Sequence, residues 1–92
     1  MAVTGDGRFY RFVGAGETVT GILHIRTILI SHDAAATGVD PVVIKNGAGT
    51  VMFEVYGAAE TVTVIPLGDG WRCNGIELDE INTGDEMTIF LN

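Results

Sequence analysis

The sequence is poor in cysteine and in positive charge, and it contains no long hydrophobic run. Its one thiol, Cys73, cannot form an internal disulfide, although small secreted domains are commonly stabilised by several. We therefore expect folding in a reducing cytoplasm, with oligomerisation as a substitute source of stability. No run reaches the roughly 18 apolar residues of a membrane span, and the N-terminus lacks the pattern of a signal peptide. A soluble protein with no membrane partner is expected.

The scarcity of positive charge excludes a further class of partner. Five Lys and Arg residues stand against twelve Asp and Glu residues, which gives a net charge of −7. The phosphates of nucleic acid and the surface of an anionic membrane repel such a chain. Nucleic acid is therefore not expected as a partner. The acidity indicates solubility, and a basic protein surface remains possible as a partner.

Glycine, in contrast, is abundant. Thirteen glycines lie mostly between apolar runs, where they are typical of tight turns. The 92 residues make one domain with a short N-terminal arm over residues 1–7. No segment keeps the 3.6-residue period of a helix over three turns. The alternation instead predicts an all-β fold, a single β-sandwich or jelly-roll-like domain of about seven to eight short antiparallel strands.

The pattern of apolar residues places the strands. They are predicted at 8–13, 20–31, 41–46, 50–56, 60–67, 71–80 and 86–91, with a turn at 68–70. Residues 20–31 form the longest apolar run, so we expect that strand at the centre of the sheet. Within the strand at 50–56, the side chains expected to face inward are those of Val51, Phe53 and Val55.

Two strands carry irregular patterns. In the strand at 20–31, Leu23 and Ile25 share one face, whereas Ile28 and Ile30 share the other. This switch indicates either burial on both faces or a β-bulge near residues 24–27. In the strand at 71–80, the Asn-Gly pair at 74–75 predicts either a bulge or a break into two short pieces.

Two sets of residues are candidates for contact with another subunit. Phe9, Tyr10 and Phe12 lie in the first strand, and exposed aromatic side chains usually mark contacts. An ordinary edge strand explains the same residues. His24 and Arg26 interrupt one face of the apolar central strand. A polar pair in that place is odd for the core of a monomer, so we expect it at a subunit interface.

The sequence contains little that points to catalysis or metal binding. His32 precedes Asp33, and a hydrolase-like protein could use this pair, although a solvated turn explains it with fewer assumptions. Cys73 is expected to be a packed thiol. The acidic residues lack the spacing of a calcium loop, and the histidines and cysteine lack that of a zinc site. We predict no catalytic residue, metal or cofactor, and no enzyme.

Aromatic residues leave one further alternative open. Trp71 and Tyr56 could stack on a sugar ring, although core and interface positions explain such residues equally simply. This gives the alternative of a carbohydrate-binding or tail- or fibre-associated β-sandwich module.

Several short motifs carry a resemblance to a known class of proteins. The order Gly21-Ile22-Leu23-His24, followed by Ile28, resembles the G-V-L-H opening of small tailed-phage virion proteins. The pattern continues with V-x-I-x-N-G at 42–47, a strand at 51–55, N-G-I at 74–76 and G-D-x-x-T-I at 84–89. The chain departs from the pattern in having RFYRFV at 8–13 and an asparagine at position 46, where aspartate is common.

The resemblance implies a function. Proteins of this class include capsid decoration (cement) proteins, which are β-sandwiches that commonly form trimers on the outer shell. It therefore implies a homotrimer that bridges subunits of the major capsid protein on the virion surface and is made in the bacterial host cytoplasm. An acidic exterior fits the outside of a virion better than its DNA-facing interior. In this interpretation Phe9, Tyr10, Phe12 and the N-terminal arm make contacts, and His24 and Arg26 lie at a subunit interface.

Overall fold

A computed structural model describes residues 3–5, 8–33 and 41–91 of the chain. The strands are β1 (Thr4–Gly5), β2 (Phe9–Phe12), β3 (Glu17–Ser31), β4 (Val42–Asn46), β5 (Val51–Val55), β6 (Val62–Glu80) and β7 (Glu86–Leu91). They form one antiparallel sheet in the order β1-β2-β7-β3-β6-β4-β5. No helix in the described ranges is long and apolar enough to cross a membrane. The predicted all-β fold is confirmed.

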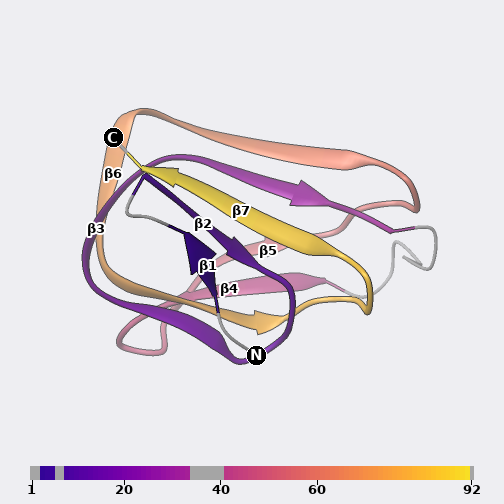
Figure 1. Cartoon of the computed structure of the whole chain (residues 1–92), viewed down its shortest axis with the longest axis horizontal. Coiled ribbons are helices and arrows are strands. Elements are labelled where there is room, and N and C mark those ends of the chain that lie inside the picture. Colours follow the sequence, from indigo (N-terminus) through magenta and orange to yellow (C-terminus); the bar gives the residue numbers. More distant parts are fainter. Residues whose placement is uncertain (1–2, 6–7, 34–40, 92) are drawn as a thin grey trace.

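The sheet folds over on itself because β3 and β6 are long and bend together (Figure 1). The last part of β3 pairs with β7 and with residues 62–66 of β6, whereas its first part pairs with residues 71–78 of β6. β4 then pairs with residues 76–80. The result is a five-stranded layer (β1-β2-β7-β3-β6) that faces a four-stranded layer (β3-β6-β4-β5), as in a β-sandwich.

The predicted turn at 68–70 is a bend inside β6, so the strands predicted at 60–67 and 71–80 are one element. On β3 the partner of Ile25 is Trp71, whereas the partner of Thr27 is Pro66, so residues 67–70 have no partner in that ladder. Gly68 and Gly70 have φ values of +61° and +113°, which glycine adopts at little cost. The strand also continues through the Asn-Gly pair at 74–75, and the register shift there lies between Val19 and Ile22.

The predicted bulge in the central strand is confirmed. Against β7, Ile25 pairs with Leu91 and Thr27 pairs with Phe90, which leaves Arg26 as the extra residue on β3. An extra residue reverses the face to which the following side chains point. Leu23 and Ile25 before the bulge and Ile28 and Ile30 after it can therefore all be buried in one core.

The core fills the space between the two layers. Its members are apolar residues from β2, β3, β4, β6 and β7: Phe12, Leu23, Ile25, Ile28, Ile30, Val42, Ile44, Cys73, Ile76, Leu78, Met87 and Ile89. In β5 the side chains of Met52, Phe53 and Val55 pack against it, whereas Val51 is exposed. The prediction for Val51 is therefore wrong, and a register shift between Ile44 and Lys45 accompanies the change of face along β5.

The alternation of β2 separates the predicted contact residues. Phe12 is 0% exposed, so it packs inside the domain and cannot contact another subunit while the domain is folded. Tyr10 is partly buried against the core. Phe9 points to the opposite side and is exposed. The part of the predicted arm at Thr4 and Gly5 pairs with Arg11 and Tyr10.

Candidate interaction surface

The outer side of the five-stranded layer carries a continuous set of apolar side chains, which we call the outer apolar face. Paired residues of antiparallel strands share one face, so the strand register identifies its members. One row runs from Phe9 through Phe90 and Thr27 to Pro66, the next from Thr88 through Leu29 to Val64, and the third from Glu86 through Ser31 to Val62. The apolar members are Phe9, Leu29, Val62, Val64, Pro66 and Phe90.

Most members of this face are exposed although they are large and apolar, and Leu29 is half-buried. Val62 is 59% exposed and Val64 is 54% exposed, while Phe9 and Phe90 are 40% and 39% exposed. Single exposed apolar residues are ordinary, but neighbouring ones on adjacent strands mark contact surfaces. These residues therefore form the best candidate for a protein-binding surface among the described residues.

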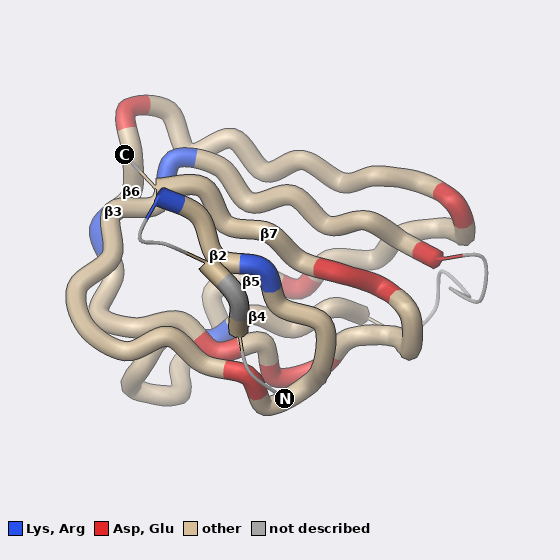
Figure 2. The backbone as a smooth tube through the Cα atoms, in the orientation of Figure 1, with Lys and Arg blue, Asp and Glu red and all other residues tan. Residues whose placement is uncertain are grey.

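The charged residues beside this face neutralise each other. Arg11 and Glu86 form an ion pair in which Arg11 Nε donates to Glu86 Oε1 at 3.0 Å. The hydrogen bond to Glu86, together with its negative charge, raises the pKa of Arg11. Most of the other acidic segments lie along the four-stranded layer or at chain turns (Figure 2). The face is thus close to neutral in a chain of net charge −7.

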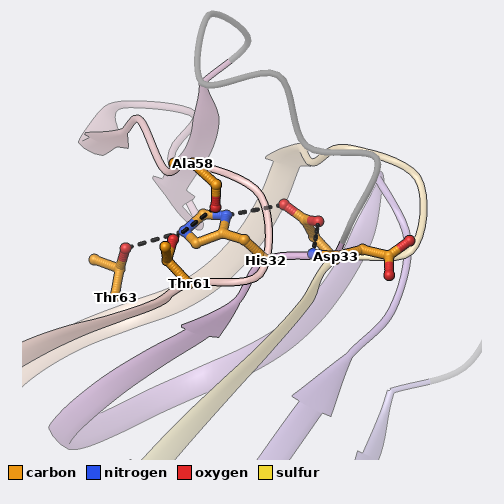
Figure 3. Close-up of polar contacts among 6 residues, drawn as sticks. His32, Asp33, Ala58, Thr61 and Thr63 are labelled. Atoms are coloured by element: carbon orange, nitrogen blue, oxygen red, sulfur yellow. Dashed lines mark hydrogen bonds and ion pairs between the residues drawn. The ribbon is translucent and has the colours of Figure 1, made fainter.

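Behind this face, His32 forms a buried polar network at one end of the sandwich (Figure 3). Its Nδ1 lies 3.0 Å from Asp85 Oδ2, and both side chains are fully buried. Its Nε2 lies 3.0 Å from the hydroxyl oxygen of Thr63. A carboxylate only accepts, so Nδ1–H donates to Asp85, and Nε2 shares a hydrogen bond with the Thr63 hydroxyl. The network ties the end of β3 to β6 and to the turn before β7.

His32 pairs with the Asp85 carboxylate and not with that of the adjacent Asp33, and because His32 is buried the solvated turn is wrong for this residue. Asp33 contributes its backbone N–H, which donates to Asp85 Oδ1 at 2.7 Å. The order Thr63–His32–Asp85 has the polarity of a hydroxyl–imidazole–carboxylate relay. However, His32 and Asp85 are shielded from solvent, and none of the three lines the grooves found among the described residues. In this structure the arrangement connects β3, β6 and the turn before β7.

Gly57 explains how the imidazole fits into this end of the molecule. A Cβ atom built on Gly57 would lie 2.0 Å from His32 Nε2, far inside van der Waals contact. The backbone of the segment between β5 and β6 therefore packs directly on the ring. Only glycine permits this approach without moving the histidine.

Trp71 and Tyr56, the two aromatic residues of the carbohydrate alternative, have different surroundings in the structure. Trp71 packs edge-on against Phe53, with ring centroids 5.8 Å apart and an interplanar angle of 73°. It lines a groove of about 560 Å³ with residues of β5 and β6, among them Arg72 and Asn74. Tyr56 is exposed but is not among the residues that line this groove. Of these two residues, Trp71 therefore lines this groove and Tyr56 does not.

The predicted interface residues His24 and Arg26 are exposed on β3, away from the buried Leu23 and Ile25. Because both side chains are exposed, their contact with another subunit stays a prediction. Cys73 is buried, as expected for a packed thiol, and burial raises its pKa. The described segments contain no group of three or more His, Cys, Asp or Glu residues that could hold a metal ion.

The sequence interpretation missed most of the outer apolar face. It identified Phe9 but none of Leu29, Val62, Val64 or Phe90 as contact residues. The parity switch in β3 was the available signal for Leu29, since a bulge at Arg26 turns Leu29 outward. Comparison with family models, curated proteins and solved structures finds no match for this chain.

Proposed function

We propose that this protein is a non-enzymatic structural protein of a tailed-phage virion, a capsid decoration protein that binds the shell through the outer apolar face. The observation that carries the proposal is an exposed, nearly neutral apolar surface on a chain of net charge −7. The resemblance of the Gly21–His24 motif and the later motifs supplies the class of assembly. It also implies self-association, commonly as a trimer.

The proposed mechanism is burial of apolar area against the shell. Phe9 and Phe90 are direct cross-strand neighbours and form the aromatic part of the face. Aromatic residues are enriched in the buried centres of protein interfaces, where charged residues are depleted. The four-stranded layer would remain in solvent, where Lys45 Nζ lies 3.3 Å from Asp79 Oδ2. This orientation keeps the acidic residues away from the contact.

Co-sedimentation with empty shells of the major capsid protein from the same genome tests the proposal. Phe90→Glu places a charge in the centre of the face, whereas Ile22→Glu places the same charge at another exposed apolar strand residue outside it. We expect the wild type and Ile22→Glu to co-sediment with shells and Phe90→Glu to bind at least tenfold more weakly. Equal binding of both variants, or no binding of the wild type, contradicts the proposal.

The Trp71 groove supports a second candidate, a carbohydrate-binding module. Trp71 is exposed and lines a groove to which Arg72 and Asn74 of the same strand also contribute. A sugar ring can stack on such an indole while amides and guanidinium groups bind its hydroxyls. A glycan array decides this point: signal lost in Trp71→Ala but kept in Tyr56→Ala favours the groove, and no signal for the wild type removes it.

A further inference from the structure

The first part of β6 has a free edge. Residues 62–66 pair with β3 on one side, whereas β4 joins β6 only at residues 76–80. Among the described residues, no strand pairs with the other side of residues 62–66. A free edge presents unpaired backbone N–H and C=O groups to any chain that can add a strand.

The hydrogen bonds to β3 show which backbone groups this edge presents. His32 N donates to Thr61 O at 2.9 Å, in continuation of the register in which Ile30 pairs with Thr63. Backbone groups alternate in direction along an antiparallel strand, so Thr61, Thr63 and Ile65 direct theirs toward β3. Val62 and Val64 direct their N–H and C=O groups to the free edge. Pro66 faces the same way and has no N–H to offer.

We propose that this edge binds β6 of a second copy of the chain in antiparallel orientation, with Val62 opposite Val64 of that copy. In this register the N–H of each valine donates to the C=O of the other, which gives four hydrogen bonds around a two-fold axis at Thr63. Both exposed donors of each copy are used, and Pro66 lies just outside the paired segment. The inference rests on the proposed function only for its biological setting, and it replaces the trimer that the resemblance implies with a two-fold dimer.

The self-complementary register favours a second copy as the occupant, and the charge of the segment permits it. Two chains of net charge −7 repel each other, so a contact between copies needs a segment without acidic residues. Residues 61–67 contain none, and Glu60 and Asp69 flank them. In the proposed register Glu60 lies opposite Pro66 of the second copy, so the two acidic flanks do not meet. Edges of monomeric proteins commonly carry lysines, prolines or bulges; residues 62–65 have none of these, and Pro66 lies outside the four proposed hydrogen bonds.

The buried network fixes the strand in the orientation that this pairing needs. The Thr63 hydroxyl oxygen lies 3.0 Å from His32 Nε2, which holds Thr63 on the inner side and Val62 and Val64 on the outer side. A slip by one residue would reverse these faces. Pairing would also bring the valines of both copies together, so that two outer apolar faces become one larger surface.

Three variants at Val64 test the inference. Val64→Pro removes the N–H at the free edge and leaves the ladder to β3, whereas Val64→Thr keeps the N–H and a branched side chain. By sedimentation equilibrium we expect a mass of twice 9.7 kDa for the wild type and Val64→Thr, and the mass of one chain for Val64→Pro. Val64→Lys places like charges at the contact and should also be monomeric. It replaces the proline variant in the test if Val64→Pro fails to fold.

Hydrogen exchange distinguishes edge pairing from contact through the outer face. We expect the amides of Val62 and Val64 to become protected, at least tenfold, as the protein concentration passes through the dimerisation range. A trimer mass, a monomer at every concentration, or a dimer in which both amides exchange freely overturns the pairing. Shell binding by a wild type that is monomeric at every concentration would leave the proposed function standing, so the two can fail separately.

Discussion

Nδ1 of His32 and Oδ2 of Asp85 lie 3.0 Å apart although the two residues are 53 positions apart in the sequence. Both side chains are fully buried, and each depends on the other for a hydrogen bond. The pair joins the end of the central strand to the turn before the last strand. It thereby holds the end of the five-stranded layer that presents Val62 and Val64.

Removing either partner of this pair should destabilise the domain. We expect His32→Ala to lower the free energy of unfolding by about 3 kcal/mol, because it leaves a buried carboxylate without one of its donors. Asp85→Ala should cost a similar amount, since Asp33 N–H also loses its acceptor. Urea unfolding measures both losses. The double variant should lose less than the sum, and strict additivity would show that the two side chains do not interact.

The two sides of β2 should respond differently to truncation. Phe12→Ala removes a fully buried ring and should lower the free energy of unfolding by about 3–5 kcal/mol. Phe9→Ala removes an exposed ring from the neighbouring face and should change it by less than about 1 kcal/mol. Thermal unfolding of the two variants beside the wild type tests this. A large loss for Phe9→Ala would place that ring in the core and remove it from the outer apolar face.

Glu60 is a position where substitution should stabilise the protein. Its φ is +60°, in the left-handed region that side chains with a Cβ adopt at a cost of roughly 1 kcal/mol. Glu60→Gly should relieve this strain and raise the melting temperature by several degrees, on the order of 4 °C. Glu54→Gly, at an exposed acidic residue in the middle of β5, is the control and should lower it. A lower melting temperature for Glu60→Gly would contradict the strain.

The buried thiol predicts a pH dependence of stability. Burial raises the pKa of Cys73 above its ordinary value of 9.0, so the folded state holds the proton more tightly than the unfolded state. This contribution is fully present below pH 9 and decreases as the pH rises through the pKa of the folded state. The wild type should therefore lose stability relative to Cys73→Ala between pH 9 and pH 11 in urea titrations. A constant difference between them would contradict a raised pKa.

Local patterns predicted the features of the fold that depend on neighbouring residues. The switch of apolar parity between Ile25 and Ile28 predicted either burial on both faces or a bulge near residues 24–27, and the bulge lies at Arg26. The strand at 86–91 was predicted with its exact bounds because apolar residues alternate along it. The bend at Gly68 and Gly70 was predicted as a turn, since glycine is suited both to a turn between two strands and to a bend within one strand. Only the pairing of both halves of β6 with β3 distinguishes the bend from the turn.

Features that depend on distant partners were not predictable. Residues 61–67 have branched or apolar side chains at almost every position, so the pattern alone does not say which face is buried. Thr63 faces inward because its hydroxyl bonds His32, and this turns Val62 and Val64 outward. The carboxylate that binds His32 comes from Asp85 instead of the adjacent Asp33. Both outcomes follow from the folded topology, which brings β3, β6 and the turn before β7 together.

Hydroxyl-radical footprinting of the protein, free and bound to capsid shells, tests the central claim most directly. Phenylalanine side chains react readily when they are exposed, and the chain offers Phe9 and Phe90 on the outer apolar face with Trp71 outside it as an internal reference. We predict that shell binding lowers the oxidation of Phe9 and Phe90 several-fold and leaves that of Trp71 unchanged. Protection of Trp71 with unchanged oxidation of both phenylalanines would contradict the assignment of the outer apolar face as the binding surface.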